Sequence, residues 1–416
     1  MPTGTPIETR HGVSGVSGKA RVRPTVVRWP KTCPTCVCFA LIVVLVVGYA
    51  FFNRLSWGTM PKNGIYPRAL SLWEDVGHRA PCIIDKPPDG TPTTWTPLNE
   101  ADQRQPSKAG ILFVKIDKAG SSTMAGVTLR IAHALGRRRA QERGLSIPQH
   151  QQICRARMSH AWSKQSDFSF GSRNRYKSFL FTMIRDPKSR AISEYNYQVG
   201  MAGIEPTEEN FLSHLKSIRN FQLGLVVDPL EKDRVKEVSN TDRMSELVSQ
   251  ASEELDYIAL LERLDESLVA MQFILGLETR DILYSSTKQS WKHILVMSRA
   301  NNFNGECKRI PKVGIPRGVK NYFEENEWRL NNMGDYLLYE AASQELDRII
   351  NAVGRIQFGE KLKQFRRAQA LADANCRPTW PCTDEGHVRS SKEQVSGCYL
   401  WDLGCNYHCL DELVLS

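Results

Sequence analysis

The sequence predicts an α/β domain with a parallel sheet flanked by helices, an N-terminal transmembrane helix and a small Cys-rich C-terminal tail. Two short apolar runs each end in a turn of small and charged residues and lead into a helical pattern, which is typical of buried parallel strands. A charge-free run lies near the N-terminus, and cysteines gather near the C-terminus. The 416 residues suffice for one large domain with appendages.

Residues 36–52 form the predicted transmembrane signal anchor. They are an uncharged run of 17 residues, which as a helix spans about 25 Å, enough for a thin bilayer. The preceding residues 1–35 are basic, so this tail is predicted to be cytoplasmic and the rest of the chain lumenal. A cleaved signal peptide, an organelle transit peptide and a buried helix are the alternatives. Residues 53–107, rich in Pro, Gly, Trp and Thr, are predicted to be a stem.

The first strand–turn–helix unit spans residues 110–130. Ile111 to Lys115 are predicted to be a strand and Asp117 to Ser121 a tight turn, and a helical pattern starts at Ser122. Backbone N–H groups at a helix N-terminus favour an anion, and Lys118 adds a positive charge. The turn therefore predicts a phosphate site, although an ordinary turn with a solvated Lys is the alternative. The nucleoside-triphosphate loop GxxxxGK[ST] is absent, because here the Lys precedes the Gly.

The second unit begins with a predicted strand from Phe179 to Ile184. Asp186 suits a helix N-cap and Pro187 suits the first helical turn. Open α/β sheets bind ligands at the C-terminal ends of their strands, so this end predicts a second anion site. The polar residues placed there are Arg185, Arg190 and Ser193, of which Arg190 is expected to support the loop.

The two motifs together, K-x-x-K-A-G-S-S-T and I-R-D-P-x-x-R-x-x-S-x-Y, resemble the Golgi carbohydrate sulfotransferases, most nearly the heparan sulfate 2-O-sulfotransferases and the galactose 3-O-sulfotransferases. The resemblance covers roughly Lys108 to Gly354. It implies a P-loop-like sulfotransferase fold and 3′-phosphoadenosine 5′-phosphosulfate (PAPS) as donor, with no metal. It also implies which residues bind the donor: Lys118, Gly120, Ser121, Ser122 and Thr123 the 5′-phosphosulfate, and Arg185 and Ser193 the 3′-phosphate.

Catalysis is expected to involve His160 and Lys118. His160 lies between the motifs, in a stretch similar to the segment that carries the catalytic His of the 2-O-sulfotransferases. A sugar hydroxyl needs a positioned base with a pKa near neutrality, which His supplies. A structural His is the alternative, and His133 and His150 are weaker candidates. Lys118 would stabilise charge on the departing phosphate.

Asp117 departs from the family pattern, which has Pro or His at that position. A carboxylate there would lie beside a strongly anionic ligand. The sequence leaves open whether Asp117 pairs with a neighbouring Lys, faces away or acts as an alternative base. Ala119 likewise replaces a residue that often carries a hydroxyl.

The rest of the domain predicts further regular structure and a basic loop. Asn210 to Leu225 is predicted to be a helix, Tyr257 to Glu262 a third strand and Leu264 to Leu277 an amphipathic helix. Val319 to Gly354 shows a long helical pattern. Lys312 to Gly318 occupies the place where, in the resembling family, a basic loop closes over the nucleotide.

An Arg cluster, Arg137 to Arg139 with Arg143, is either a solvated helix end or a contact for a polyanionic glycan. The net charge of +10 does not indicate nucleic acid as a partner if the domain is lumenal.

Eight cysteines follow the anchor and allow up to four disulfides in an oxidising compartment. Five lie between residues 376 and 409, so they need an outside partner such as Cys307 or leave one thiol free. They predict a disulfide-stapled tail over residues 367–416. A zinc site is the alternative, since CNYHC at 405–409 offers three ligands.

The sequence therefore predicts a carbohydrate O-sulfotransferase of the Golgi membrane, single-pass type II, with a lumenal catalytic domain at residues 108–366 that acts on a glycan or glycosaminoglycan. Two alternatives remain. One is an inactive, glycan-binding relative. The other is a Golgi glycosyltransferase, although the D-x-D motif of the metal-dependent kind is absent from the sequence.

Overall fold

The computed structural model describes residues 110–142, 144, 154, 156–159, 178–227, 235–236, 240–285, 293–296, 306–377, 379–389 and 407–414. The predicted tail, anchor and stem lie outside these residues, as do Arg143, His150 and His160. Among the helices in the described ranges, none is long and apolar enough to cross a membrane.

The centre of the domain is a parallel sheet of four strands in the order β2-β1-β3-β4. The strands are β1 (Gly110–Val114), β2 (Ala156–Ser159), β3 (Ser178–Ile184) and β4 (Tyr257–Leu260). The predicted α/β class and its parallel sheet are thus confirmed. The chain moves one way across the sheet from β1 to β2 and the other way from β3 to β4. The topological switch point, where such sheets bind ligands, therefore lies between β1 and β3.

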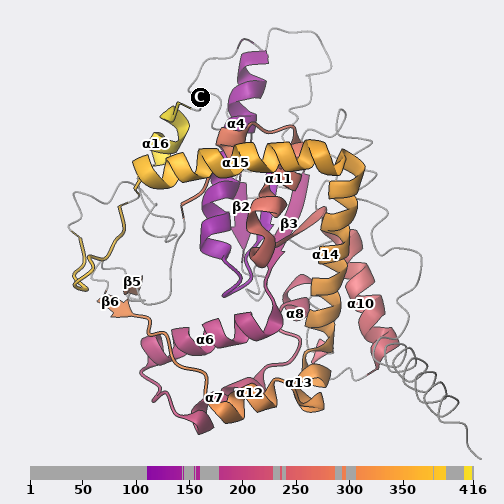
Figure 1. Cartoon of the computed structure of the whole chain (residues 1–416), viewed down its shortest axis with the longest axis vertical. Helices are drawn as coiled ribbons and strands as arrows, with labels where there is room; N and C mark the ends of the chain where they lie inside the picture. Colours follow the sequence, from indigo (N-terminus) through magenta and orange to yellow (C-terminus); the bar gives the residue numbers. More distant parts are fainter. Residues whose placement is uncertain are drawn as a thin grey trace, which may run out of the picture. The chain divides into compact units, whose positions relative to one another are not determined.

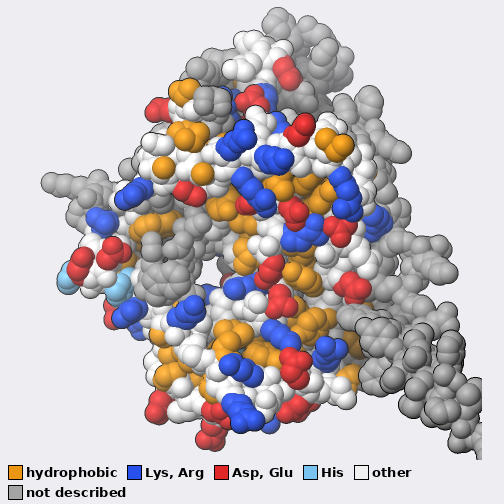
Figure 2. Space-filling view, in the orientation of Figure 1, with side chains coloured by type: hydrophobic (Ala, Val, Ile, Leu, Met, Phe, Trp, Pro, Cys, Tyr) orange, Lys and Arg blue, Asp and Glu red, His pale blue; other side chains and the backbone are white. Residues whose placement is uncertain are grey.

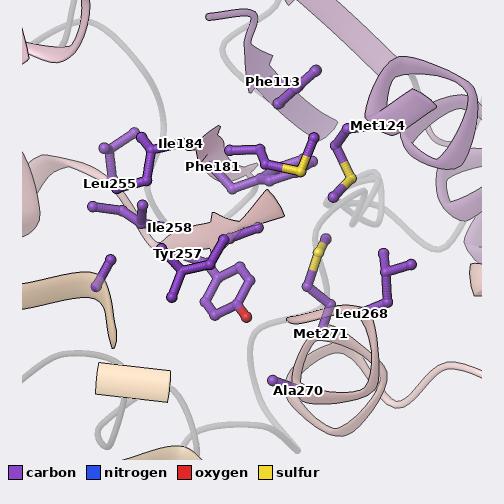
Figure 3. Packing of buried hydrophobic residues seen from close by; sticks show 14 of the residues in the cluster. Phe113, Met124, Phe181, Ile184, Leu255, Tyr257, Ile258, Leu268, Ala270 and Met271 are labelled. Carbon is purple, nitrogen blue, oxygen red and sulfur yellow. The ribbon is translucent and has the colours of Figure 1, made fainter. Parts of the chain in front are cut away.

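Strands β1, β3 and β4 are fully buried because helices pack against the sheet, whereas Ala156 and Met158 of the edge strand β2 are half-buried. The rings of Phe113 on β1 and Phe181 on β3 stack with centroids 4.8 Å apart. Met124 of helix α4 (Ser121–Glu142) and Met271 of helix α11 (Leu264–Leu275) lie in the same buried cluster (Figure 3). Continuous apolar runs, rather than alternating ones, are what strands with two covered faces require.

A second, smaller core holds the helices that follow β3. It packs α6 (Pro187–Ala202) with α7 (Glu208–Ser217), α12 (Arg317–Tyr322) and α13 (Asn326–Asn331), which lie together in the lower part of Figure 1. The ring of Tyr195 stacks on Phe211 at 3.9 Å, and Trp328 is fully buried beside them. This core fixes α6, which carries Ser193.

The helix predicted from Asn210 to Leu225 is wrong in its second half. Helix α7 ends at Ser217, and α8 (Leu223–Val226) is a separate short helix. Asn220 causes the break, because its backbone has a positive φ of 41° and its Oδ1 accepts a hydrogen bond of 2.7 Å from Gly334 N. The chain turns there to cap a helix more than a hundred residues away.

The long helical pattern from Val319 to Gly354 is divided into three helices. These are α12, α13 and α14 (Met333–Val353). Asn332, which ends α13 and precedes α14, is not helical and donates its side-chain amide to Trp328 O at 3.1 Å. The third predicted strand also stops early, at Leu260, because Leu261–Arg263 form a 3₁₀ turn.

The long helices α10 (Thr241–Glu254), α14 and α15 (Arg355–Asn375) complete the domain, and α15 runs across the top of α14 in Figure 1. The boundary expected between residues 366 and 367 falls inside α15. Blue and red side chains alternate over the face drawn in Figure 2, so charges of one sign do not gather there into a single patch.

Two disulfides bind the C-terminal segment to the domain. Cys307, on the antiparallel hairpin β5 (His293–Val296) and β6 (Glu306–Arg309), pairs with Cys382, as the odd cysteine count suggested. Cys376 pairs with Cys409 of α16 (Tyr407–Glu412). The described residues contain no cluster of three or more His, Cys, Asp or Glu side chains that would hold a metal.

Helix α16 is also tied to α4 through the buried Arg130. The Arg130 guanidinium donates to the backbone oxygens of Leu283 and Arg280, and to Asp411 Oδ1 at 2.9 Å. The helix that follows β1 is thereby fastened to the most C-terminal helix described.

Candidate active site

The two turns that the sequence singled out meet at one edge of the sheet. Parallel strands β1 and β3 are neighbours, so the residues that follow them leave the sheet side by side. Arg185 Nη1, after β3, donates a hydrogen bond of 3.2 Å to the carbonyl oxygen of Lys118, after β1. The structure therefore joins the two predicted anion sites.

The first turn requires a glycine at position 120. Gly120 has a φ of +73° and accepts the first helical hydrogen bond of α4 from Met124 N at 3.1 Å. A Cβ there would lie 2.7 Å from Leu261 Cδ1 and 2.9 Å from Met183 Cε. The positive φ disfavours a side chain at this position, and an added Cβ would require the ends of Leu261 and Met183 to shift. The strand end and the helix start are thus held tightly against each other.

The N-terminus of α4 presents an environment suited to an anion. Ser121, Ser122 and Thr123 form its first turn, and no acidic residue occurs in that turn. The first N–H groups of a helix have no carbonyl partner within the helix, and the helix dipole is positive there. The turn therefore offers backbone donors and hydroxyls to a phosphate or sulfate group.

Lys118 is held beside this turn. Its φ of 66° is unusual for a residue with a side chain. Its Nζ lies 4.0 Å from the centroid of the Tyr197 ring, a cation–π contact with helix α6. The Lys118 side chain thus extends from the turn after β1 to helix α6, which follows β3.

Arg185 is partly buried and is held from several sides. Burial lowers its pKa, while the charges of Glu262 and Asp186 oppose that shift. Its Nε lies 3.7 Å from Glu262 Oε1. The Arg185 backbone N and O form hydrogen bonds of 2.8 Å with the side-chain amide of Gln222. The guanidinium stays charged, and the backbone from which it extends is held in place by Gln222.

Helix α6 carries the other residues of the second motif. Asp186 caps it, with Oδ1 accepting from Ser189 N at 2.8 Å, as the sequence predicted. Ser193 lies one turn before Tyr197 on the same helix and is half-buried. Arg190 is only 1% exposed, packs over the Phe221 ring at 4.0 Å and lies 2.8 Å from Glu194. Arg190 thus packs inside the domain, and the supporting role expected for it remains a prediction.

Gln222, Glu262 and Asp335 contribute to this edge and were not identified from the sequence. Asp335 accepts hydrogen bonds from the backbone N atoms of Gln222 and Leu223. Glu262 Oε2 accepts from Asp186 N at 3.1 Å. Glu262 is the last residue of the third strand predicted from the sequence, so its position at a strand end was a signal that the sequence offered. Nothing in the local sequence of Gln222 indicated its contact.

The other residues singled out from the sequence include two histidines, Asp117 and the Arg cluster. His160 lies outside the described residues, so its role remains a prediction. Asp117 and His133 are half-buried. Arg138 forms ion pairs with Asp281 and, at 3.9 Å, with Glu278, so the Arg cluster is partly neutralised.

The predicted basic loop lies along α6. Within Lys312 to Gly318, Val313 N donates to Asn196 Oδ1 at 3.2 Å. Asn196 is one residue from Tyr197, so this loop approaches the helix that carries the second motif. Whether it closes over a ligand remains a prediction.

A search of curated proteins found no match to this chain, and a search of solved structures found none either. The comparison with protein-family models is informative. Residues 105–302 contain strands β1 to β5 and both turns described above. These residues match the model of the sulfotransferase family, and the chain therefore carries a domain of that family.

Proposed function

We propose that this domain transfers the sulfuryl group of PAPS to a hydroxyl group of a glycan or glycosaminoglycan in the Golgi lumen. Sulfuryl transfer is the reaction of the family to which residues 105–302 belong. The observation that carries the proposal is the hydrogen bond between Arg185 and Lys118, because it brings two cationic turns within reach of one ligand that is charged at both ends.

The residues at the sheet edge fit PAPS. The α4 N-terminus and Lys118 would hold the 5′-phosphosulfate, since the first turn of α4 offers backbone donors and carries no acidic residue. Arg185 and Ser193 would hold the 3′-phosphate. The Arg185 guanidinium offers paired donors suited to a phosphate, and Glu262 contacts it through Nε.

The chemistry of the chain's own residues follows from this placement. His160 would take the proton of the acceptor hydroxyl as the new S–O bond forms. Lys118 and the N–H groups of the α4 turn would stabilise the charge that develops on the 5′-phosphate oxygen as the old S–O bond breaks. By analogy with phosphoryl transfer, positioning and charge stabilisation supply most of the acceleration.

The acceptor and the compartment are supported by the sequence rather than by the site. The predicted signal anchor and stem are typical of Golgi transferases, and the two disulfides favour an oxidising compartment. An inactive, glycan-binding protein is the second candidate, because Asp117 adds a carboxylate beside the turn that would hold the phosphosulfate.

The test is transfer of ³⁵S from labelled PAPS to a panel of glycans by the full-length chain in detergent. Transfer is expected with the wild-type chain. The Lys118→Ala variant should lose about 30- to 1000-fold in rate, as for loss of one charged transition-state contact. Glycan binding that is equal in both forms, without transfer to any acceptor, would instead identify a lectin.

A further inference from the structure

The side chain of Gln222 makes an unusual pair of contacts. Gln222 is fully buried just before α8. The oxygen and the nitrogen of its side-chain amide both form hydrogen bonds with the main chain of a single residue. Its Oε1 accepts from Arg185 N at 2.8 Å, and its Nε2 donates to Arg185 O at 2.8 Å. The amide thus acts toward Arg185 as a neighbouring strand would act.

Arg185 needs such a partner because it lies just past the end of the sheet. Strand β3 ends at Ile184, and its pairing with β4 ends at the same residue. The N–H and C=O of Arg185 are therefore outside the ladder, and partly buried backbone groups without partners are costly. Glutamine supplies one donor and one acceptor in a single planar group, which no apolar side chain can do.

Gln222 is itself held in place by the carboxylate of Asp335. Its backbone N donates to Asp335 Oδ2 at 3.1 Å, and Leu223 N donates to Asp335 Oδ1 at 2.8 Å. Asp335 is buried in the first turn of α14. The positive charge of Arg190 and these backbone hydrogen bonds act against the rise in pKa that burial imposes on Asp335. A buried network thus connects α14, through Gln222, to the backbone of Arg185.

This network determines where the Arg185 guanidinium can lie. Its Nη1 reaches Lys118 O and its Nε faces Glu262 while the backbone is held by Gln222. Without the two hydrogen bonds from Gln222, the Arg185 backbone could shift, and the guanidinium would shift with it. We propose that Gln222 is a positioning residue that orients the Arg185 guanidinium toward the 3′-phosphate of the donor. It thereby sets the preference of the site for a 3′,5′-bisphosphate over a 5′-monophosphate. This inference rests on the proposed function.

The test compares two nucleotides on the full-length chain by calorimetry. Adenosine 3′,5′-bisphosphate carries the group that Arg185 would contact, and adenosine 5′-monophosphate lacks it. The variant Gln222→Met keeps a similar volume and no charge but removes both hydrogen bonds to Arg185. Its affinity for the bisphosphate should fall about tenfold or more, while its affinity for the monophosphate should change less than about twofold.

A matched control comes from another buried glutamine. Gln272 on α11 donates a hydrogen bond of 3.3 Å to Thr279 Oγ1 rather than to Arg185. The variant Gln272→Met should leave the ratio of the two affinities unchanged. If Gln222→Met fails to fold by circular dichroism, Gln222→Asn replaces it, since it is neutral and too short to span both Arg185 groups. The same fall in the ratio is expected.

The outcomes separate this inference from the function on which it rests. A wild-type chain that binds the bisphosphate no better than the monophosphate overturns the proposed function, and the inference with it. A wild-type chain that discriminates, with Gln222 variants that lose both ligands equally or neither, overturns the inference alone.

Discussion

The guanidinium of Arg185 donates a hydrogen bond of 3.2 Å to the carbonyl oxygen of Lys118, so the residues that follow β3 and β1 hold each other directly. Arg185 thereby serves the geometry of the first turn as well as its own proposed contact. The predictions below are chosen to test the two turns separately.

Replacement of Arg185 by Lys should weaken the binding of adenosine 3′,5′-bisphosphate by about 10- to 100-fold. Lysine keeps the charge but loses the paired donors and the hydrogen bond to Lys118 O. Calorimetry on the folded variant measures this. Arg243→Lys is the control, because Arg243 is on the surface and pairs with Glu246. Equal affinities in all three proteins would contradict the assignment of Arg185.

Replacement of Gly120 by Ala should destabilise the domain by about 1–3 kcal/mol and weaken nucleotide binding. The new Cβ would meet Leu261 Cδ1 at 2.7 Å in a backbone with φ of +73°. Gly276→Ala separates the two causes, since Gly276 has a φ of +61° and open space around it. Thermal unfolding should show a larger loss for Gly120→Ala. Similar losses would show that close packing at the turn contributes nothing.

Replacement of Tyr197 by Leu should lower the rate of sulfuryl transfer by about 2- to 30-fold, because the Lys118 ammonium loses the aromatic face that lies 4.0 Å away. Tyr197→Phe keeps that face and should retain most of the rate. Steady-state kinetics with labelled PAPS distinguish the two variants. If Phe costs as much as Leu, the phenol oxygen matters and the cation–π contact does not.

Glu345 predicts a dependence of stability on pH. Burial raises its pKa to about 7, although Arg348 opposes the shift. Below its ordinary pKa of 4.5, the Glu345 carboxyl group is protonated in both the folded and the unfolded state. It therefore does not lower the free energy of unfolding at such pH. Between about pH 4.5 and pH 7 the carboxyl group is ionised in the unfolded state but keeps its proton in the folded state, so stability falls across this window by at most about 3 kcal/mol; above about 7 both states are ionised and no further loss occurs.

Replacement of Glu345 by Gln should remove this loss. The melting temperature of the variant should exceed that of the wild type at pH 8, and the difference should shrink toward pH 4.5. Glu360→Gln, on the exposed face of α15, is the control. Parallel melting curves for Glu345→Gln and the wild type across this pH range would refute the prediction.

Local sequence signals were sufficient for the centre of the fold. The apolar runs around Phe113 and Phe181 located β1 and β3 to within one residue, because strands covered on both faces leave no polar positions. Asp186 and Pro187 located the start of α6, since capping depends on immediate neighbours. The count of cysteines pointed to Cys307 as an outside partner.

Contacts between distant residues account for what the sequence did not reveal. Asn220 breaks a helical pattern because it bonds to Gly334, which is 114 positions away. Gln222 holds Arg185 across 37 positions, and no periodicity encodes such a pairing. The roles of Lys118, Ser193 and the α4 turn in binding PAPS remain predictions, and so does the role of His160.

The bond between Arg130 and Asp411 has a consequence for biosynthesis. Asp411 is synthesised 281 residues after Arg130, and the Cys376–Cys409 bridge can close only once Cys409 has been made. Helix α4, which begins at the turn after β1, can therefore form early, but its contact with Asp411 waits until 281 further residues have been made.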